Sequence, residues 1–167
     1  MFIKFAIHVG ENVLLNFLDQ IIVVGGYASN GISKTTEVLR NGSAVRCNIP
    51  SFLFGIFRQA SAVIPNGLVM CGGSVDYRSC LRLTSENEWV SFPSLKQKWG
   101  NFDIIYMNEK LWAIGRGYRF EYIDPNTGSQ WTYKTQGPYR HSDDSCSAKL
   151  SNNRIIVTGG RYRRVSS

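Results

Sequence analysis

A short apolar run that stops on a glycine recurs four times in this chain of 167 residues. The glycines that end these runs are Gly25, Gly72, Gly115 and Gly159, at intervals of 47, 43 and 44 residues. A second glycine follows at three of the four sites, and Arg116 takes its place at the third. Self-similarity at a fixed period of about 20–50 residues is the sequence signature of solenoids and propellers, so it constrains the fold before any local pattern does.

Two further markers keep the same period. Pro50, Pro93 and Pro138 lie 43 and 45 residues apart, and Trp89 and Trp131 follow the second and third glycine sites. Between the markers run short segments rich in Ile, Val, Phe and Tyr, separated by Gly, Pro and Asn. Short strands with such turns are typical of all-β folds, and the constant period favours a propeller over a sandwich.

The second unit predicts a complete blade. Its four antiparallel strands are expected at residues 59–64, 68–71, 79–83 and 89–92. The third unit repeats this order, whereas the fourth predicts only two strands, at residues 145–150 and 154–158. The sequence therefore predicts an all-β, partial (open) propeller of about 3.5 four-stranded antiparallel blades.

The markers also place the units and their boundaries. Blade boundaries are expected near residues 53–57, 96–100 and 139–144. The repeat units are expected near residues 21–52, 57–95, 100–138 and 141–163 of a propeller that occupies residues 21–167.

Residues 1–20 do not follow the repeat. Three interpretations stay open: a secretory leader, a single first strand from Lys4 to Val9, and a short amphipathic helix. No apolar run in the chain reaches the roughly 18 residues of a membrane-spanning helix, so no transmembrane segment is expected.

Charge and cysteine usage limit the classes of partner and cofactor. The net charge is +7, but the basic residues are scattered through the repeats and accompany no nucleic-acid-binding motif, so nucleic acid is not an expected partner. Four cysteines and two histidines without any C-x-x-C spacing predict no metal site, and no cofactor is expected. Cys71 and Cys80 flank one predicted hairpin loop, where they form either a disulfide across the strands or two buried free thiols.

The repeat resembles the Kelch family of propellers over residues 21–160. The resemblance rests on a strand ending in Gly-Gly, a Tyr-Asp-Pro-like hairpin and a following Trp, seen here as Cys71-Gly72-Gly73 with Trp89 and as Ile114-Gly115, Tyr122-Ile123-Asp124-Pro125 and Trp131. The cysteine-containing version of the pattern is similar to secreted Kelch proteins of invertebrates. That similarity slightly favours an extracellular over a cytoplasmic location.

Kelch propellers present loops for recognition, and the resemblance implies the same here. The loops after the glycine sites and the loops between blades are expected on one face, and they hold Tyr, Trp and Arg, the types enriched at binding hot spots. The candidate binding residues are Tyr27, Asn30, Asp76, Tyr77, Arg78, Trp99, Tyr118, Arg119, Tyr139 and Arg140.

A non-catalytic module that recognises a protein is therefore the expected function. No pair of carboxylates suited to acid–base chemistry is evident, and only His141 lies within the repeats, so no catalytic residue is expected. The alternatives are a glycan-binding module and a truncated fragment without independent function. An open stack of blades leaves two faces and two strand edges uncovered, so self-association through the open ends is also expected.

Overall fold

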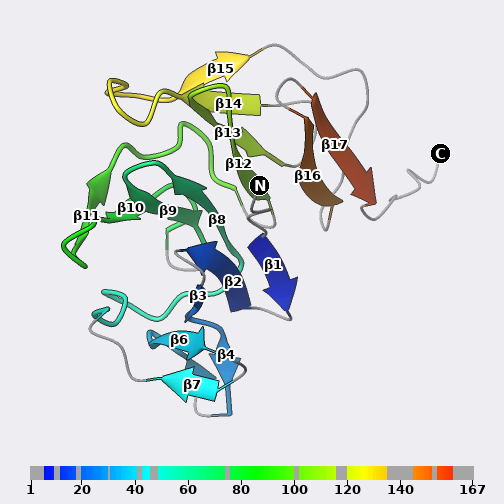
Figure 1. The fold of residues 1–167 in the computed structure, drawn as a ribbon. Coiled ribbons are helices and arrows are strands. Elements are labelled where there is room, and N and C mark those ends of the chain that lie inside the picture. The colour runs from blue at the N-terminus through cyan, green and yellow to red at the C-terminus, as the bar shows by residue number, and fades with distance from the viewer. Residues whose placement is uncertain are drawn as a thin grey trace.

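The computed structural model describes residues 6–9, 12–17, 20–29, 31–40, 43–45, 49–73, 76–99, 102–115, 120–134, 145–151 and 154–159. In these ranges the chain forms strands, turns and loops, and they hold no helix that could span a membrane. The strands gather into four consecutive antiparallel sheets that fan around a common centre (Figure 1).

The first sheet has five strands in the order β1-β2-β3-β6-β7. Its strands are β1 (Ala6–Val9), β2 (Asn12–Phe17), β3 (Gln20–Val24), β6 (Thr36–Arg40) and β7 (Ser43–Val45). The short strands β4 (Tyr27–Ala28) and β5 (Gly31–Ile32) form a separate hairpin within the connection from β3 to β6.

Residues 6–17 correct an expectation from the sequence, which allowed at most one strand before Ile21. The structure has two, because β2 pairs with the apolar strand β3 through Val13 and Val24 and through Leu15 and Ile22. Asn12 and Asn16 weaken the alternation of apolar and polar residues in this segment, so its own sequence predicts a strand poorly. Pairing with β3 decides its conformation, since tertiary context often outweighs β-propensity. β2 thus takes the place in the first blade that β8 takes in the second, and β1 is an additional strand on the other edge of β2.

The other sheets follow the repeat. The second is β8 (Gln59–Ile64), β9 (Gly67–Gly72), β10 (Cys80–Leu83) and β11 (Trp89–Phe92), and the third is β12 (Asp103–Met107), β13 (Lys110–Ile114), β14 (Phe120–Ile123) and β15 (Thr132–Lys134). The fourth consists of β16 (Ser145–Ser151) and β17 (Arg154–Gly159) in the described part of the chain. Among the described residues no strand of the fourth sheet pairs with a strand of the first, which agrees with the expected all-β, partial propeller.

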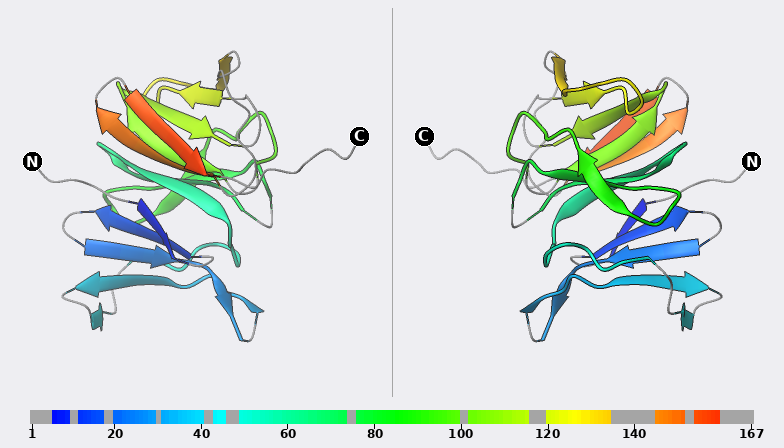
Figure 2. Two further views of the ribbon diagram at one scale, coloured as in Figure 1. Left: turned by 90° about the vertical axis from the view of Figure 1, so that its right-hand side faces the viewer. Right: turned by 90° about the vertical axis from the view of Figure 1, so that its left-hand side faces the viewer.

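The innermost strands β2, β8, β12 and β16 contact one another in this order around the centre. In the side views, the first sheet lies at one end and the third and fourth lie at the other, with the second between them (Figure 2). The fourth sheet is attached through Asp103, whose Oδ2 accepts hydrogen bonds from the Ser147 backbone N–H (2.5 Å) and from Ser147 Oγ (2.8 Å).

The glycines end their strands where the segment between two blades crosses over the sheet. Gly25 and Gly72 have φ angles of +70° and +71°, which favour glycine. A β-carbon at Gly25 would clash with the carbonyl oxygen of Ile56, and one at Gly72 would lie 2.5 Å from the ring of Phe102. The close approach of the linker to the strand backbone therefore explains why glycine recurs at the ends of these strands.

The first three sheets bury two apolar layers between them, and a smaller third layer lies between the third and fourth sheets. β9 contributes to both, because Leu68 and Met70 pack toward the first sheet while Val69 and Cys71 pack toward the third. A disulfide joins Cys71 to Cys80 across β9 and β10, with the Cα atoms 4.1 Å apart, so the structure has the bridge rather than two free thiols.

A tryptophan in each complete repeat ties its blade to the preceding one. The indole N–H of Trp89 donates to the Pro50 carbonyl (3.1 Å), and that of Trp131 donates to the Pro93 carbonyl (2.7 Å). The ring of Trp131 is fully buried and that of Trp89 is half-buried. The two periodic markers of the sequence, proline and tryptophan, are therefore partners in one hydrogen bond.

The variant Trp131→Phe removes this donor and leaves part of a buried volume empty. We expect it to lower the free energy of unfolding by about 1–3 kcal/mol, the combined scale of a lost buried hydrogen bond and a small cavity. Urea denaturation measures the change. Trp89→Phe is the matched control and should cost less, because its ring is half-buried; equal costs would contradict the assigned role of burial.

Candidate functional site

The loop after the second glycine pair is built around the side chain of Asp76. Its Oδ2 accepts a hydrogen bond from Ser79 Oγ (2.6 Å), and its Oδ1 accepts one from the Arg78 backbone N–H (3.1 Å). The bond from Ser79, then the bond from Arg78 and the charges of Arg78 and Lys98, hold the pKa of Asp76 below its ordinary value. The carboxylate is therefore charged at neutral pH and fixes the turn.

Backbone hydrogen bonds tie the same loop to the linker between the second and third blades. The N–H of Leu95 donates to the Arg78 carbonyl (2.9 Å), and the N–H of Trp99 donates to the Tyr77 carbonyl (3.0 Å). The first blade repeats both bonds, from Phe52 N–H to the Lys34 carbonyl (2.8 Å) and from Ile56 N–H to the Ser33 carbonyl (3.0 Å). This loop is therefore held at both its turn and its base.

The held loop exposes an aromatic ring beside two cations. Tyr77 is 42% exposed, and Asp76, Arg78 and Lys98 are exposed as well. We call these four residues the loop surface. Since hydrogen bonds fix the loop backbone before a partner arrives, binding would not require the loop backbone to become ordered.

The structure separates the candidate residues into three groups. It brings Asp76, Tyr77 and Arg78 together as expected for one loop. It corrects the expectation for Trp99, which is only 3% exposed because its ring packs against Phe102 between two blades. Tyr27 lies in β4, but its side chain is not described, and the remaining candidates lie outside the described residues: Asn30, Tyr118, Arg119, Tyr139 and Arg140.

Glu121 is a positioning residue that the sequence analysis missed. It is fully buried in β14, and its carboxylate accepts hydrogen bonds from the backbone N–H groups of Lys96 (2.8 Å) and Gln97 (3.0 Å) and from the indole of Trp99 (3.1 Å). It therefore holds the linker to which the loop surface is tied. The available signal was its position two residues before Ile123, which places both side chains on the face of β14 that is turned toward the second sheet.

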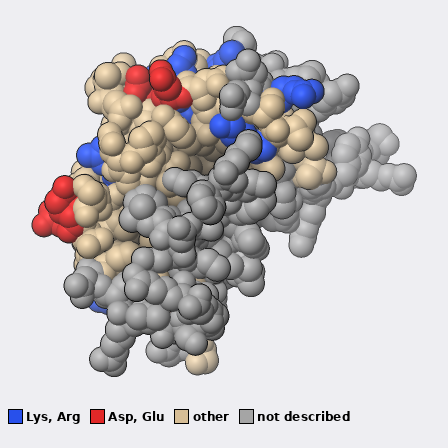
Figure 3. All heavy atoms as spheres, in the orientation of Figure 1, with Lys and Arg blue, Asp and Glu red and all other residues tan. Residues whose placement is uncertain are grey.

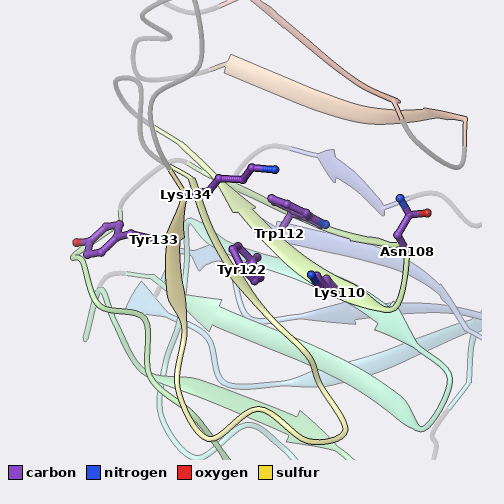
Figure 4. A pocket seen from close by; sticks show the side chains of 6 residues that line it. All are labelled: Asn108, Lys110, Trp112, Tyr122, Tyr133 and Lys134. Atoms are coloured by element: carbon purple, nitrogen blue, oxygen red, sulfur yellow. The ribbon is translucent and has the colours of Figure 1, made fainter.

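A hollow of about 380 Å³ lies on the other face of the third sheet (Figure 4). The rings of Trp112 and Tyr122 have centroids 5.1 Å apart and are tilted by 37°. Lys110 Nζ lies 4.8 Å from the Tyr122 centroid, and Lys134 Nζ lies 5.3 Å from the Trp112 centroid. We call these four residues, with Asn108 at the rim, the aromatic shelf; Tyr133 borders the hollow but points to the other side of β15 in Figure 4.

Charged groups of both signs lie on the face of the molecule that Figure 3 shows. On the face seen in Figure 3, separate groups of Lys and Arg alternate with clusters of Asp and Glu, and the described part of this face shows no continuous basic patch. The described residues also contain no group of three His, Cys, Asp or Glu side chains that could hold a metal ion.

Comparison with known proteins supports the architecture. No protein-family model matches the chain. Kelch-like protein 42 of Mus musculus and that of Homo sapiens are each 32% identical over 80 residues, covering 41% of this chain and 15% and 14% of those proteins. The repeats of this chain are Kelch-like.

The solved structure of YjhT shares the fold. The two structures superpose with a TM-score of 0.72 at 13% sequence identity, over 93% of this chain and 60% of YjhT. At that identity the likeness concerns the β-propeller fold alone. The chain spans less than two thirds of the length of each of these three proteins.

The variant Glu121→Gln tests how the linker is held. An amide has one oxygen where the carboxylate has two, so at least one buried N–H group loses its acceptor. We expect a loss of about 2–3 kcal/mol in the free energy of unfolding, since unmet buried groups and hydrogen bonds to charges each lie on this scale.

Glu37→Gln is the matched control. Glu37 pairs with Val23, two residues before Gly25, as Glu121 pairs with Ala113, two residues before Gly115, but Glu37 is exposed. Its change should stay within about 0.5 kcal/mol. Urea denaturation that gives the same change for both variants would contradict the role of Glu121.

Proposed function

We propose that this chain is a non-catalytic recognition module that binds a protein partner through the loop surface. The observation that carries the proposal is the held loop, in which Tyr77 and Arg78 are exposed while their backbone carbonyls are bonded to the next linker. Tyr and Arg are enriched among residues that dominate binding energy. The similarity of 80 residues to Kelch-like protein 42 supports a repeat of this kind.

The variants Tyr77→Ala and Arg78→Ala test the proposal. Proteins captured by the immobilised wild-type chain are identified by mass spectrometry, and their affinities are then compared across variants. We expect each substitution to weaken a true partner at least about tenfold, the effect of losing a hot-spot side chain. Glu86→Ala, in the exposed turn between β10 and β11, is the control and should leave binding unchanged. A partner that all three variants bind equally would contradict the proposal.

A glycan is the second candidate ligand for the same surface. The exposed ring of Tyr77 lies in the same loop surface as Arg78 and Lys98, a combination that suits an acidic sugar. A glycan array probed with the wild-type chain and with Tyr77→Ala separates the two candidates. Glycan binding that disappears in the variant would replace the protein partner in the proposal.

We also propose that the chain belongs to the secreted, cysteine-containing type of Kelch protein. The Cys71–Cys80 disulfide supports an oxidising compartment, where such bonds persist. Peptide mapping of natively produced protein, before and after reduction, is expected to show a gain of two hydrogens in the peptides that contain Cys71 and Cys80. Both thiols free before reduction would contradict an extracellular location.

Self-association through the open ends stays a prediction. The exposed side chains of Leu150 (59%) and Ile156 (48%) on the fourth sheet support it, because exposed apolar side chains on an unpaired hairpin favour association.

A further inference from the structure

A disulfide closes the base of the loop that carries the loop surface. Cys71 lies in β9 and Cys80 begins β10, so the bond between them encloses residues 72–79. Three of the four residues of the loop surface belong to this segment. The sulfur of Cys80 also lies 3.7 Å from the carbonyl oxygen of Arg78. The covalent closure and the exposed side chains are therefore parts of one small unit.

The same disulfide packs against the linker that holds the loop. Cys71 and Cys80 are at most 3% exposed and belong to one apolar cluster with Leu95 and Trp99. The backbone N–H groups of Leu95 and Trp99 are the donors that hold the two loop carbonyls. Since a packed interior transmits small changes in spacing, separation of the two sulfurs would disturb the linker residues that fix the loop.

The first blade holds the equivalent loop without a disulfide. Its equivalent pair is Val24 and Thr36, which lie opposite each other in β3 and β6. Between them the chain forms the hairpin β4–β5, whose strands pair within the loop. The described residues of the second loop, 73 and 76–79, contain no such strand pair. In the second blade the disulfide therefore takes the place of pairing within the loop.

We propose that the oxidation state of Cys71 and Cys80 sets the shape of the loop surface, so that the chain binds through Tyr77 and Arg78 only after these thiols have been oxidised. This inference rests on the proposed binding through the loop surface. A covalent bond removes open conformations from the segment that it encloses. Without the bond, binding has to order the loop backbone as well, and the affinity falls.

Oxidation of the pair takes a disulfide-containing oxidant. The thiolate of one cysteine attacks a sulfur of the oxidant, whose S–S bond breaks and whose other sulfur leaves as a thiolate. The thiolate of the second cysteine then attacks the mixed disulfide, which forms the Cys71–Cys80 bond and releases the remaining sulfur of the oxidant. Two electrons pass to the oxidant, and the two thiol protons end on its sulfurs. Because both cysteines are buried in the folded chain, this exchange takes place while the loop is open.

The repeat supplies an internal reference for the loop. The amides of Leu95 and Trp99 donate to the second loop, and those of Phe52 and Ile56 make the same bonds in the first blade. Residue-resolved hydrogen–deuterium exchange therefore reports the opening of both loops in one sample. A loss of global stability would speed exchange at all four amides, whereas loss of the loop closure would speed it at the first two.

The double variant Cys71→Val/Cys80→Val removes the bond and keeps apolar side chains that suit paired strands. We expect the amides of Leu95 and Trp99 to exchange at least about tenfold faster than in the oxidised wild-type chain, and the reference amides to change by less than about twofold. The reduced wild-type chain should behave in the same way, which separates loss of the bond from a change in packing. Val69→Ala is the control, because it removes apolar volume from the same cluster and leaves the disulfide in place.

A single-domain antibody provides a binding readout that needs no natural partner. It is selected on the oxidised wild-type chain and kept only if Tyr77→Ala abolishes its binding, so that it reports the shape of the loop surface. Its affinity for the double cysteine variant should fall at least about tenfold, whereas its affinity for Val69→Ala should stay within about twofold. Failure to find a natural partner would leave this result unaffected.

Three results would overturn the inference. The first is unchanged exchange at Leu95 and Trp99 when the bond is absent. The second is an equal acceleration at Phe52 and Ile56, since the disulfide would then stabilise the whole fold rather than the loop. The third is unchanged affinity of the antibody for the double variant, because the loop surface would then keep its shape without the bond.

Discussion

The placement of one sheet against the next depends on the hydrogen bond from a tryptophan indole to the proline carbonyl that ends the preceding blade. It is made twice, across sequence separations of 39 and 38 residues, so one geometry is repeated at two interfaces. Apolar packing alone is tolerant of sliding, because the hydrophobic effect has no direction. A buried donor such as Trp131 Nε1 has to meet its acceptor or lose stability, which fixes the register of the second interface. At the second interface Glu121 adds three more hydrogen bonds to the same linker.

Equivalent positions in the repeat differ in chemistry according to what covers them. Val69 is buried under the third blade, whereas Trp112 at the same position is half-exposed beside two lysines. Glu121 is enclosed by the second linker, whereas Glu37 in the first sheet is exposed. Positions that the next blade or linker covers at one interface are therefore uncovered where no such element packs on them in the described part of the chain. The loop surface is separate from these positions, because backbone hydrogen bonds hold its loop to the linker that follows the second blade.

Much of the architecture was predictable, because the glycines and tryptophans act through local backbone geometry and a fixed period. The strands of the second and third blades follow from that period, as does the loop that brings Asp76, Tyr77 and Arg78 together. β2 was not predictable, because Asn12 and Asn16 obscure an alternation that only pairing with β3 reveals. Trp99 was wrongly expected to be exposed and Glu121 was not named, because the sequence does not show that each satisfies the other in a buried contact.

Every described sheet is made from one continuous stretch of chain, and its interfaces reach only the next stretch. Ordering such a chain needs no pairing between distant ends, so loop-closure entropy stays small and folding can propagate from one blade to its neighbour. As the chain is synthesised, the first blade can therefore form before the third exists. The Cys71–Cys80 bond fits this order, since both thiols belong to one hairpin and oxidation can follow as soon as that hairpin forms.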